Sequence, residues 1–277
     1  MKYGLLFVNY NNTHYSKDLL DSVLLDHHGS DTPIIIVDNC SSEQSVLELR
    51  EIDLKYDSVH VIYHSQNIGY FKGLNIGLRR IKSIFPDIVY WVVGNNDLLF
   101  PKEFGNQLKQ AKSILDVYPV VSPDIRTLDG LPQNPAVTDS ISKFREFIYD
   151  LNYSSFYLSR VIHWLADLTS NFTDRTDETS SCDIAREIYQ GYGACYVLGP
   201  KFFKEFGELW APSFLGYEEF FIAKQLEEKG FRTFYEPSIN VIHQCKGSTG
   251  TATKRFMWQR FREGHKVYRK YVKVWSL

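Results

Sequence analysis

Closely spaced cysteines are absent from this sequence of 277 residues. The four cysteines stand far apart and form no Cys-x-x-Cys pair. A structural zinc site needs clustered thiolates, and a disulfide framework needs many cysteines in a short chain. The sequence therefore predicts reduced, mostly buried thiols at Cys40, Cys182, Cys195 and Cys245.

Long apolar runs are missing as well. The longest, such as residues 88–93, are far shorter than the ~20 residues that cross a bilayer. Residues 1–8 pass from one lysine into a short apolar stretch without a small-residue cleavage site, which predicts a first strand. We expect a cytoplasmic protein. The alternative is a protein that contacts the inner face of the membrane peripherally.

A large excess of one charge is the third absence. The chain has 33 acidic and 31 basic residues, a formal net charge of −2, which argues against a surface built for nucleic acid. Its composition is 44% hydrophobic and 15% aromatic, enough to bury a large core. We expect one elaborated domain, with or without an appendage.

Short apolar runs alternate with segments of helical spacing in the first hundred residues. This alternation predicts an α/β fold with a mostly parallel sheet and helices on both faces, whose ligands gather outside the carboxyl ends of the strands. The predicted strands are residues 3–9, 33–38, 59–63 and 88–93, and the predicted helices lie near 19–24, 45–54 and 73–84.

The alternation fades over residues 131–189, which we interpret as an insertion in a domain of residues 1–250. Helices are predicted at 141–151 and 156–168, followed by a loop at 169–181 that is rich in Ser, Thr and Asp. Strands resume at 189–199 and 231–243, and residues 251–277 form a basic, amphipathic helix.

Polar residues follow each predicted strand of the first half. Such residues are common as turn formers and helix caps, but four sets on one sheet edge favour ligand contact. The candidates at these strand ends are Asn9, Tyr10, Asn11, Asp38, Asn39, Asn67, Asn95, Asn96 and Asp97.

A glycine-rich run begins at Asn67 and reads Asn-Ile-Gly-Tyr-Phe-Lys-Gly-Leu-Asn-Ile-Gly. Spaced glycines let backbone amides and a helix N-terminus approach a phosphate closely. The run matches neither the dinucleotide fingerprint nor the P-loop. Its candidate ligand contacts are Asn67, Gly69, Gly73 and Asn75.

Two adjacent acids, Glu218 and Glu219, stand at the start of a predicted helix, and His243 follows the next strand. Acids are favoured in the first turn of any helix, so a solvated helix start is one reading. The other reading is a functional pair, which the aromatic neighbours favour. A lone histidine is more often a core residue, but the position of His243 favours metal or diphosphate contact.

These motifs together resemble inverting family 2 glycosyltransferases, including the rhamnosyltransferase-like members. The matching pieces are Val-Asp-Asn-x-Ser from residue 37, the glycine run, the Asp-x-Asp position at Asn95-Asn96-Asp97, the acid pair, and His243-Gln-Cys-Lys-Gly-Ser248. Two residues depart from the family pattern: Asn95 replaces the first acid of Asp-x-Asp, and Glu219 replaces an aspartate.

The resemblance implies a GT-A fold and direct inversion, in which a sugar moves from a UDP- or dTDP-sugar to a hydroxyl of a glycan or lipid-linked acceptor. It assigns the base to Glu219, the supporting acid to Glu218, and an Mg²⁺ or Mn²⁺ site to Asp97 and His243. It also implies a hexosyltransferase of polysaccharide or cell-envelope synthesis.

Two alternatives stay open. A sugar-phosphate nucleotidyltransferase would share the sheet and the metal, but the first loop lacks the expected glycine- and basic-rich sequence. A non-catalytic relative that binds glycans or nucleotide sugars would keep the fold without working acids.

Residues 254–273 place Lys and Arg among aromatic residues with helical spacing. Such a helix suits the surface of an anionic membrane. A solvated packing helix or a subunit contact is the alternative, and nucleic-acid binding ranks third because no recognised module accompanies the helix.

Overall fold

The computed structural model describes residues 1–24, 32–169, 182–245 and 254–273. The strands are β1 (Gly4–Asn9), β2 (Ile34–Asp38), β3 (Val59–Tyr63), β4 (Trp91–Asn95), β5 (Leu98–Leu99), β6 (Val120–Thr127), β7 (Arg186–Ile188), β8 (Cys195–Leu198) and β9 (Thr233–His243). The helices are α1 (Thr13–Leu24), α2 (Glu43–Lys55), α3 (Tyr70–Ile84), α4 (Phe104–Gln110), α5 (Lys112–Val117), α6 (Lys143–Ser154), α7 (Phe156–Thr169), α9 (Pro200–Glu205), α10 (Glu218–Glu227) and α11 (Lys254–Tyr268).

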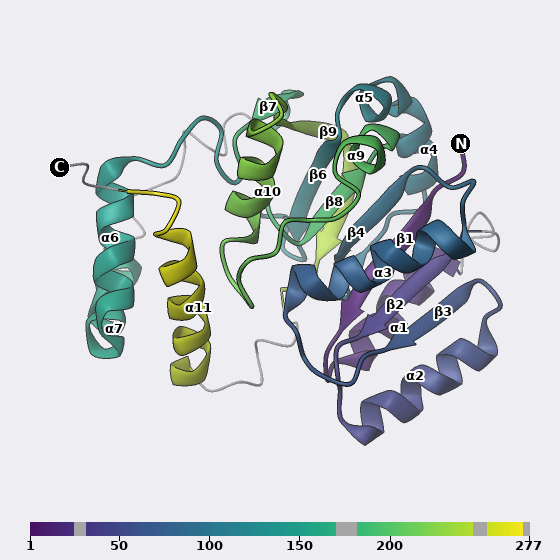
Figure 1. The fold of residues 1–277 in the computed structure, drawn as a ribbon, viewed down its shortest axis with the longest axis horizontal. Coiled ribbons are helices and arrows are strands. Elements are labelled where there is room, and N and C mark those ends of the chain that lie inside the picture. The colour runs from purple at the N-terminus through teal and green to yellow at the C-terminus, as the bar shows by residue number, and fades with distance from the viewer. Residues whose placement is uncertain (25–31, 170–181, 246–253, 274–277) are drawn as a thin grey trace.

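In the described part of the chain, the strands form one sheet in the order β3-β2-β1-β4-β8-β6-β9-β5, with β7 also paired to β9 (Figure 1). Strands β1 to β4, β6 and β9 run in one direction, and β5, β7 and β8 run against them. The predicted α/β fold with a mostly parallel sheet is confirmed.

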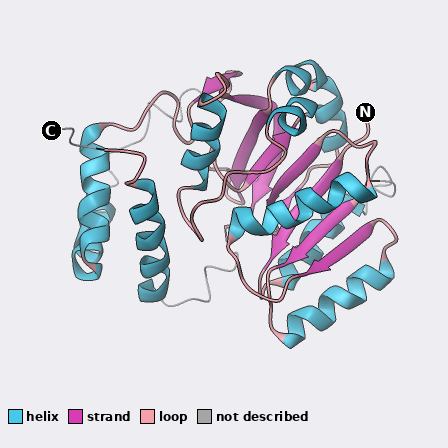
Figure 2. Cartoon of the chain, in the orientation of Figure 1, coloured by secondary structure: helices cyan, strands magenta, loops and turns pink. Residues whose placement is uncertain are grey.

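Helices cover both faces of this sheet (Figure 2). Leu5 and Phe7 of β1 face one hydrophobic cluster, which α1, α2, α4 and α5 complete. Leu6, between them, faces a second cluster with α3, α9 and α10. This alternation along one strand is the period of two expected for a strand buried on both faces.

Most predicted helices and strands of the first half begin and end within three residues of the observed bounds. The strand expected at 88–93 begins later, at Trp91, because Phe85 accepts a turn hydrogen bond from the Ile88 amide. The prediction of one continuous strand over residues 189–199 is wrong. Gly191 and Gly193 fall in an irregular segment, and β8 starts only at Cys195.

Helices α6 and α7 confirm the two helices predicted within 131–189. Together with α11 they form a group of helices on the far side of α10 from the sheet (Figure 1). Trp258 and Arg262 of α11 donate hydrogen bonds to the Asn152 and Tyr153 carbonyls of α6, at 2.9 Å each. We call α6, α7, α11 and residues 269–273 the helical annex. The predicted loop, apart from Thr169, lies outside the described residues.

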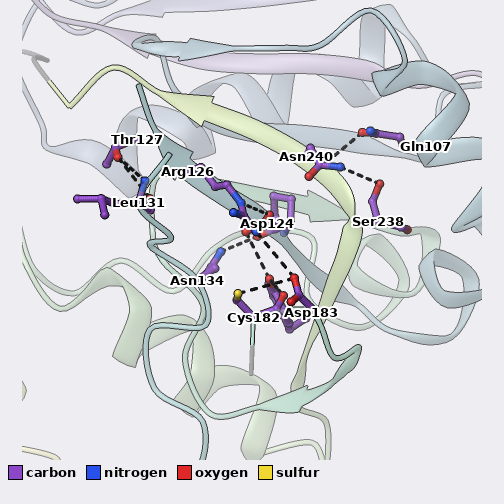
Figure 3. A network of polar contacts seen from close by, with 12 residues as sticks. Gln107, Asp124, Arg126, Thr127, Leu131, Asn134, Cys182, Asp183, Ser238 and Asn240 are labelled. Atoms are coloured by element: carbon purple, nitrogen blue, oxygen red, sulfur yellow. Dashed lines mark hydrogen bonds and ion pairs between the residues drawn. The ribbon is translucent and has the colours of Figure 1, made fainter. Parts of the chain in front are cut away.

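The register between β6 and β9 shifts after Pro123. Polar side chains satisfy the interrupted ladder, as Figure 3 shows. Gln107 Oε1 accepts a hydrogen bond from the backbone amide of Asn240 at 3.0 Å, and Arg126 Nε donates to Asp124 Oδ2 at 2.7 Å. Asn134 donates to the Pro123 carbonyl at 2.7 Å. The irregular ladder therefore anchors a loop that reaches the site described below.

No helix among the described residues combines the length and the apolar character that crossing a bilayer requires.

Candidate active site

The carboxyl ends of β1, β2 and β4 meet at one edge of the sheet. Asn9 lies opposite Asp38 in the register, and Val8 lies opposite Asn95. The structure thus brings together the polar strand ends that the sequence marked as separate candidates. This edge is where an α/β sheet of this kind binds ligands.

Asn9 is fully buried and links three elements at this edge. Its Nδ2 donates to Asp38 Oδ1 at 3.1 Å, and its Oδ1 accepts from Asn96 Nδ2 at 3.0 Å and from Ser16 Oγ at 3.0 Å. Asn12 completes the network by donating to Asn96 Oδ1 at 3.1 Å. Asn12 and Ser16 were not identified from the sequence, where they resemble ordinary helix-start residues.

The loop after β1 is braced against the loop after β2. The Asn11 amide donates to Ser41 Oγ at 2.9 Å, and Asn11 Oδ1 accepts from the Ser42 amide at 2.6 Å. Asp38 Oδ2 accepts a hydrogen bond from the Ser41 amide, three residues further along, at 3.1 Å. Tyr10 is half-buried beside this brace. The Asp38 carboxylate is therefore held in one orientation.

Asn39 ties the glycine run to this edge. Its Oδ1 accepts the Ile68 amide at 3.0 Å, and its Nδ2 donates to Asn67 Oδ1 and to the Gly69 carbonyl at 3.1 Å each. Gly69 has φ +93°, and a Cβ there would lie 2.0 Å from the Phe214 carbonyl oxygen. Only glycine fits this approach, which places the N-terminus of α3 at the same edge.

Gly73 and Asn75 lie further along α3. A Cβ on Gly73 would be 3.2 Å from Val8, so α3 packs tightly on β1. Asn75 exchanges two hydrogen bonds with the Leu209 backbone, at 2.7 and 2.8 Å. The side-chain amide of Asn75 is thus engaged within the protein, and its expected contact with the sugar donor stays a prediction.

Asp97 and His243 form a buried pair. Asp97 follows β4, and His243 ends β9 opposite Leu98. Asp97 Oδ1 and His243 Nε2 are 3.2 Å apart, and Oδ1 receives no hydrogen bond from the described residues. The rest of the predicted motif after His243, Lys-Gly-Ser, lies outside the described residues.

Gln133 determines which ring nitrogen of His243 carries a proton, and therefore whether the nitrogen near Asp97 can accept. Gln133 Oε1 lies 2.8 Å from His243 Nδ1, and Gln133 Nε2 donates to Cys245 Sγ at 3.3 Å. An amide oxygen can only accept, so Nδ1 carries a proton, and in the neutral imidazole the lone pair of Nε2 points toward Asp97. Either a proton on Nε2 or a bound cation can satisfy this pair of atoms, which lie 3.2 Å apart.

This pair fits a divalent ion chemically, because a carboxylate oxygen and an imidazole nitrogen both suit Mn²⁺ or Mg²⁺ sites. Within the described ranges, no group of three His, Cys, Asp or Glu side chains could hold a metal. Further ligands would have to come from solvent or from a bound anion.

Glu218 and Glu219 begin α10, directly after Tyr217, which has the left-handed φ of 68°. Glu219 Oε1 accepts the Gly193 amide at 3.1 Å. A Cβ on Gly193 would lie 2.6 Å from that oxygen, so glycine is needed for this contact. The solvated helix start that the sequence left open does not describe Glu218, which is 8% exposed.

Burial raises the pKa of both acids. The pKa of Glu218 rises to about 8, through burial first and the charge of Glu219 second. The pKa of Glu219 also rises through burial, while hydrogen bonds from backbone amides, including that of Gly193, oppose the rise. Because the two carboxyl groups interact, the pair loses its protons in two steps that belong to the pair.

Tyr192 lies near both the acid pair and the Asp97–His243 pair. Its ring centre is 5.8 Å from that of His243, and its amide donates to Asn134 at 2.6 Å. Its pKa rises to about 12, through burial and then the charges of Glu219, Cys245 and Asp97. The sequence shows only a tyrosine between two glycines, and it did not identify Tyr192 as a site residue.

An open groove of about 750 Å³ lies at the opposite edge of the sheet, lined among others by Lys2, Tyr3, His60 and Lys109. It contains none of the predicted site residues. Since the strands start there, it is separate from the chemistry at the carboxyl edge.

The sequence profile described as Glycosyl transferase family 2 matches residues 5–154, more than half of the chain. No curated protein matches the chain.

Solved structures with similar folds include three glycosyltransferase chains. GalNAc-T7 with UDP, GalNAc and Mn²⁺ is 13% identical with a TM-score of 0.58, over 87% of this chain and 43% of that chain. The mannosyltransferase PcManGT from Pyrobaculum calidifontis, in complex with GDP-Man and Mn²⁺, is 13% identical with a TM-score of 0.58, over 98% of this chain and 65% of that chain. TarS from S. aureus is 14% identical with a TM-score of 0.55, over 89% of this chain and 37% of that chain. The chain thus spans less than two thirds of each, and at these identities the likeness shows the fold.

Proposed function

The chain belongs to glycosyl transferase family 2, and on this basis we propose that it transfers a sugar from a nucleoside diphosphate donor to an acceptor hydroxyl. The observation that carries the proposal is that Tyr192 lies near both the acid pair, with Glu218 buried and Glu219 half-buried, and the carboxylate–histidine pair. The solved relatives that contain UDP, GDP-Man and Mn²⁺ support it.

The donor in this proposal is a UDP- or dTDP-sugar bound at the carboxyl edge. The Asp38 carboxylate accepts from the base or the ribose, and the N-terminus of α3 approaches the diphosphate. The proposed donor-contact set is Asn9, Tyr10, Asn11, Asp38, Asn39, Asn67, Gly69, Gly73, Asn75, Asn95 and Asn96. The buried members act by holding the loops in position.

Asp97 and His243 hold Mg²⁺ or Mn²⁺ in the same proposal. A divalent ion supplies positive charge that neutralises the diphosphate as it leaves. Gln133 keeps the Nε2 lone pair of His243 available for that ion.

Glu219 acts as the base. It takes the proton of an acceptor hydroxyl while that oxygen bonds to the anomeric carbon and the bond to the diphosphate breaks, with inversion. Glu218, protonated at neutral pH, supports it. The transferred group is a hexosyl unit such as rhamnose, and the acceptor is a glycan or lipid-linked sugar of envelope polysaccharide synthesis.

Donor hydrolysis tests the function without knowledge of the acceptor. A panel of nucleotide sugars is incubated with the protein, and release of UDP or dTDP is measured with Mn²⁺, with Mg²⁺ and with excess EDTA. We expect release from at least one donor, abolished by EDTA and restored by added metal. Tight donor binding without release of UDP or dTDP from any donor would instead identify a non-catalytic binding relative.

Asp97→Asn isolates the metal step. The variant keeps the shape of the side chain but loses the charge, so metal-dependent binding of UDP or dTDP should weaken strongly while the unfolding midpoint changes little. Undiminished turnover in excess EDTA would contradict the metal site.

A further inference from the structure

The outer surface of α6 and α7 exposes large apolar side chains. Phe144 is 73% exposed, Tyr157 74% and Trp164 60%, and Val161 and Leu165 are about half exposed. The extended Ser155 separates α6 from α7, and the two helices pack against each other. We call this surface the annex face. An exposed apolar surface of this kind marks a contact site.

The acids of α6 point away from the annex face, toward α11. Arg269 pairs with Glu146 at 2.7 Å and with Asp150 at 2.6 Å, and His265 Nε2 lies 2.8 Å from Asp150. These carboxylates are therefore neutralised between the helices. Several basic residues of the annex stay exposed: Lys143, Arg160, Lys254, Arg255, Lys266 and Lys270.

Charge is concentrated in this part of the chain. Residues 143–169 and 254–273 contain eleven Lys and Arg against four Asp and Glu, a net charge of +7, whereas the whole chain has −2. A second copy would bring a second annex of net charge +7 against the first, which disfavours a symmetric dimer here. Anionic lipid complements both the charge and the apolar surface.

Tyrosine and tryptophan side chains favour the bilayer interface, because one end of each ring system is apolar and the other forms hydrogen bonds. We propose that the annex face docks on an anionic lipid bilayer, with Tyr157 and Trp164 inserted at headgroup depth and the exposed basic residues above anionic headgroups. This surface differs from the one expected from the sequence, because Arg262, His265 and Arg269 of residues 254–273 are engaged inside the annex.

Docking of this face would hold the acid pair near the lipid surface. Tyr217, which precedes Glu218, stacks on Tyr268 with ring centres 4.3 Å apart, and its hydroxyl lies 2.7 Å from His265 Nδ1. The N-terminus of α10 is thus fastened to the annex. The proposal goes beyond sugar transfer, and its test requires no turnover.

Vesicle co-sedimentation of the full chain tests the proposal. We expect binding to phosphatidylcholine vesicles that contain phosphatidylglycerol and little binding to pure phosphatidylcholine. Binding should weaken in about 1 M salt, where charges are screened beyond ~3 Å. The double variant Tyr157→Ser/Trp164→Ser should lose at least about tenfold in partitioning, because two interfacial anchors are removed. Leu54→Ser, at an 87% exposed position on α2, is the matched control and should bind normally.

A charge series gives a second, independent arm. Arg160→Gln/Lys254→Gln should lower binding to anionic vesicles by about 10- to 30-fold, since each basic residue near the surface contributes to the attraction. Lys2→Gln/Lys109→Gln removes the same charge at the opposite edge of the sheet and should have little effect.

Three results would overturn the proposal. The first is equal sedimentation of wild type and both annex variants, and the second is equal binding to neutral and anionic vesicles. The third is a dimer, seen by sedimentation velocity and dissociated by Tyr157→Ser/Trp164→Ser, without vesicle binding; it would assign the face to a second copy. Lipid-free donor hydrolysis should be unchanged in all variants, which separates this test from that of the transferase function.

Discussion

Glu219 is the residue whose chemistry is easiest to isolate. Glu219→Gln keeps the shape and still offers an oxygen to the Gly193 amide, but it cannot take a proton. Transfer should fall by ~10²-fold or more, while the UDP or dTDP affinity measured by calorimetry barely changes. If Glu219→Gln transfers normally and Glu218→Gln is inactive, the base is Glu218 instead.

Gln133 acts on the metal site through His243. Gln133→Leu removes the acceptor for Nδ1–H, so the imidazole should populate both tautomers and bind Mn²⁺ about 10- to 100-fold more weakly in the presence of UDP. Nitrogen-15 NMR of the metal-free protein reports the tautomer, and electron paramagnetic resonance reports free Mn²⁺. Gln44→Leu, on the surface of α2, is the control. An unchanged tautomer and affinity would remove the positioning role.

Glu218 should make stability depend on pH. Its folded pKa of about 8 is above the unfolded value, so its protonated form favours folding fully below the unfolded pKa, and this contribution is lost as pH rises toward 8. Glu218→Gln should therefore be more stable than wild type at pH 8, by on the order of a few kcal/mol, and flatten the profile. Urea unfolding from pH 5 to 9 measures this, with the exposed Glu43→Gln as control. Parallel profiles for wild type and Glu218→Gln would contradict the raised pKa.

At the scale of elements, Gly69 decides how α3 enters the site. Gly69→Ala combines a positive φ with a Cβ 2.0 Å from the Phe214 carbonyl, so α3 and the segment before α10 would have to separate. Gly130→Ala has a similar φ of +82° but no atom within 4 Å of its Cβ.

The control should lose about 1 kcal/mol of unfolding free energy, the cost of the backbone conformation alone. Gly69→Ala should lose clearly more and also weaken nucleotide binding. Urea denaturation and calorimetry measure the two effects. Equal destabilisation of both variants would show that the close approach to Phe214 contributes nothing.

At the scale of the whole molecule, Arg269 fastens the helical annex together. Arg269→Met leaves the buried Glu146 and the half-buried Asp150 without their cation, and should cost about 3 kcal/mol of unfolding free energy. Arg79→Met breaks an exposed ion pair with Glu208 of similar length, 2.8 Å, and should cost less than about 1 kcal/mol. Equal urea midpoints for the two variants would show that the annex is held by other contacts.

Elements that depend on local periodicity could be predicted from the sequence, as β3 at Val59–Tyr63 shows. The polar residues after β1, β2 and β4 could also be placed at one edge, because parallel strands connected by helices must end together. The continuous strand predicted at 189–199 was wrong. Its glycines make close contacts with Ser122 and Glu219, and an apolar pattern in the sequence cannot indicate such contacts.

By itself, the sequence determined the α/β order and the adjacent acid pair, because both depend on residue type and short spacing. Asp97 and His243 were joined only through the resemblance to family 2 glycosyltransferases. Only the tertiary structure decided that Gln133 orients a histidine 110 positions away, that Tyr192 lies near both pairs, and that Arg269 neutralises the acids of α6. The physical reason is that these contacts join residues distant along the chain, and their partners depend on how the sheet register and helix packing route the chain between them.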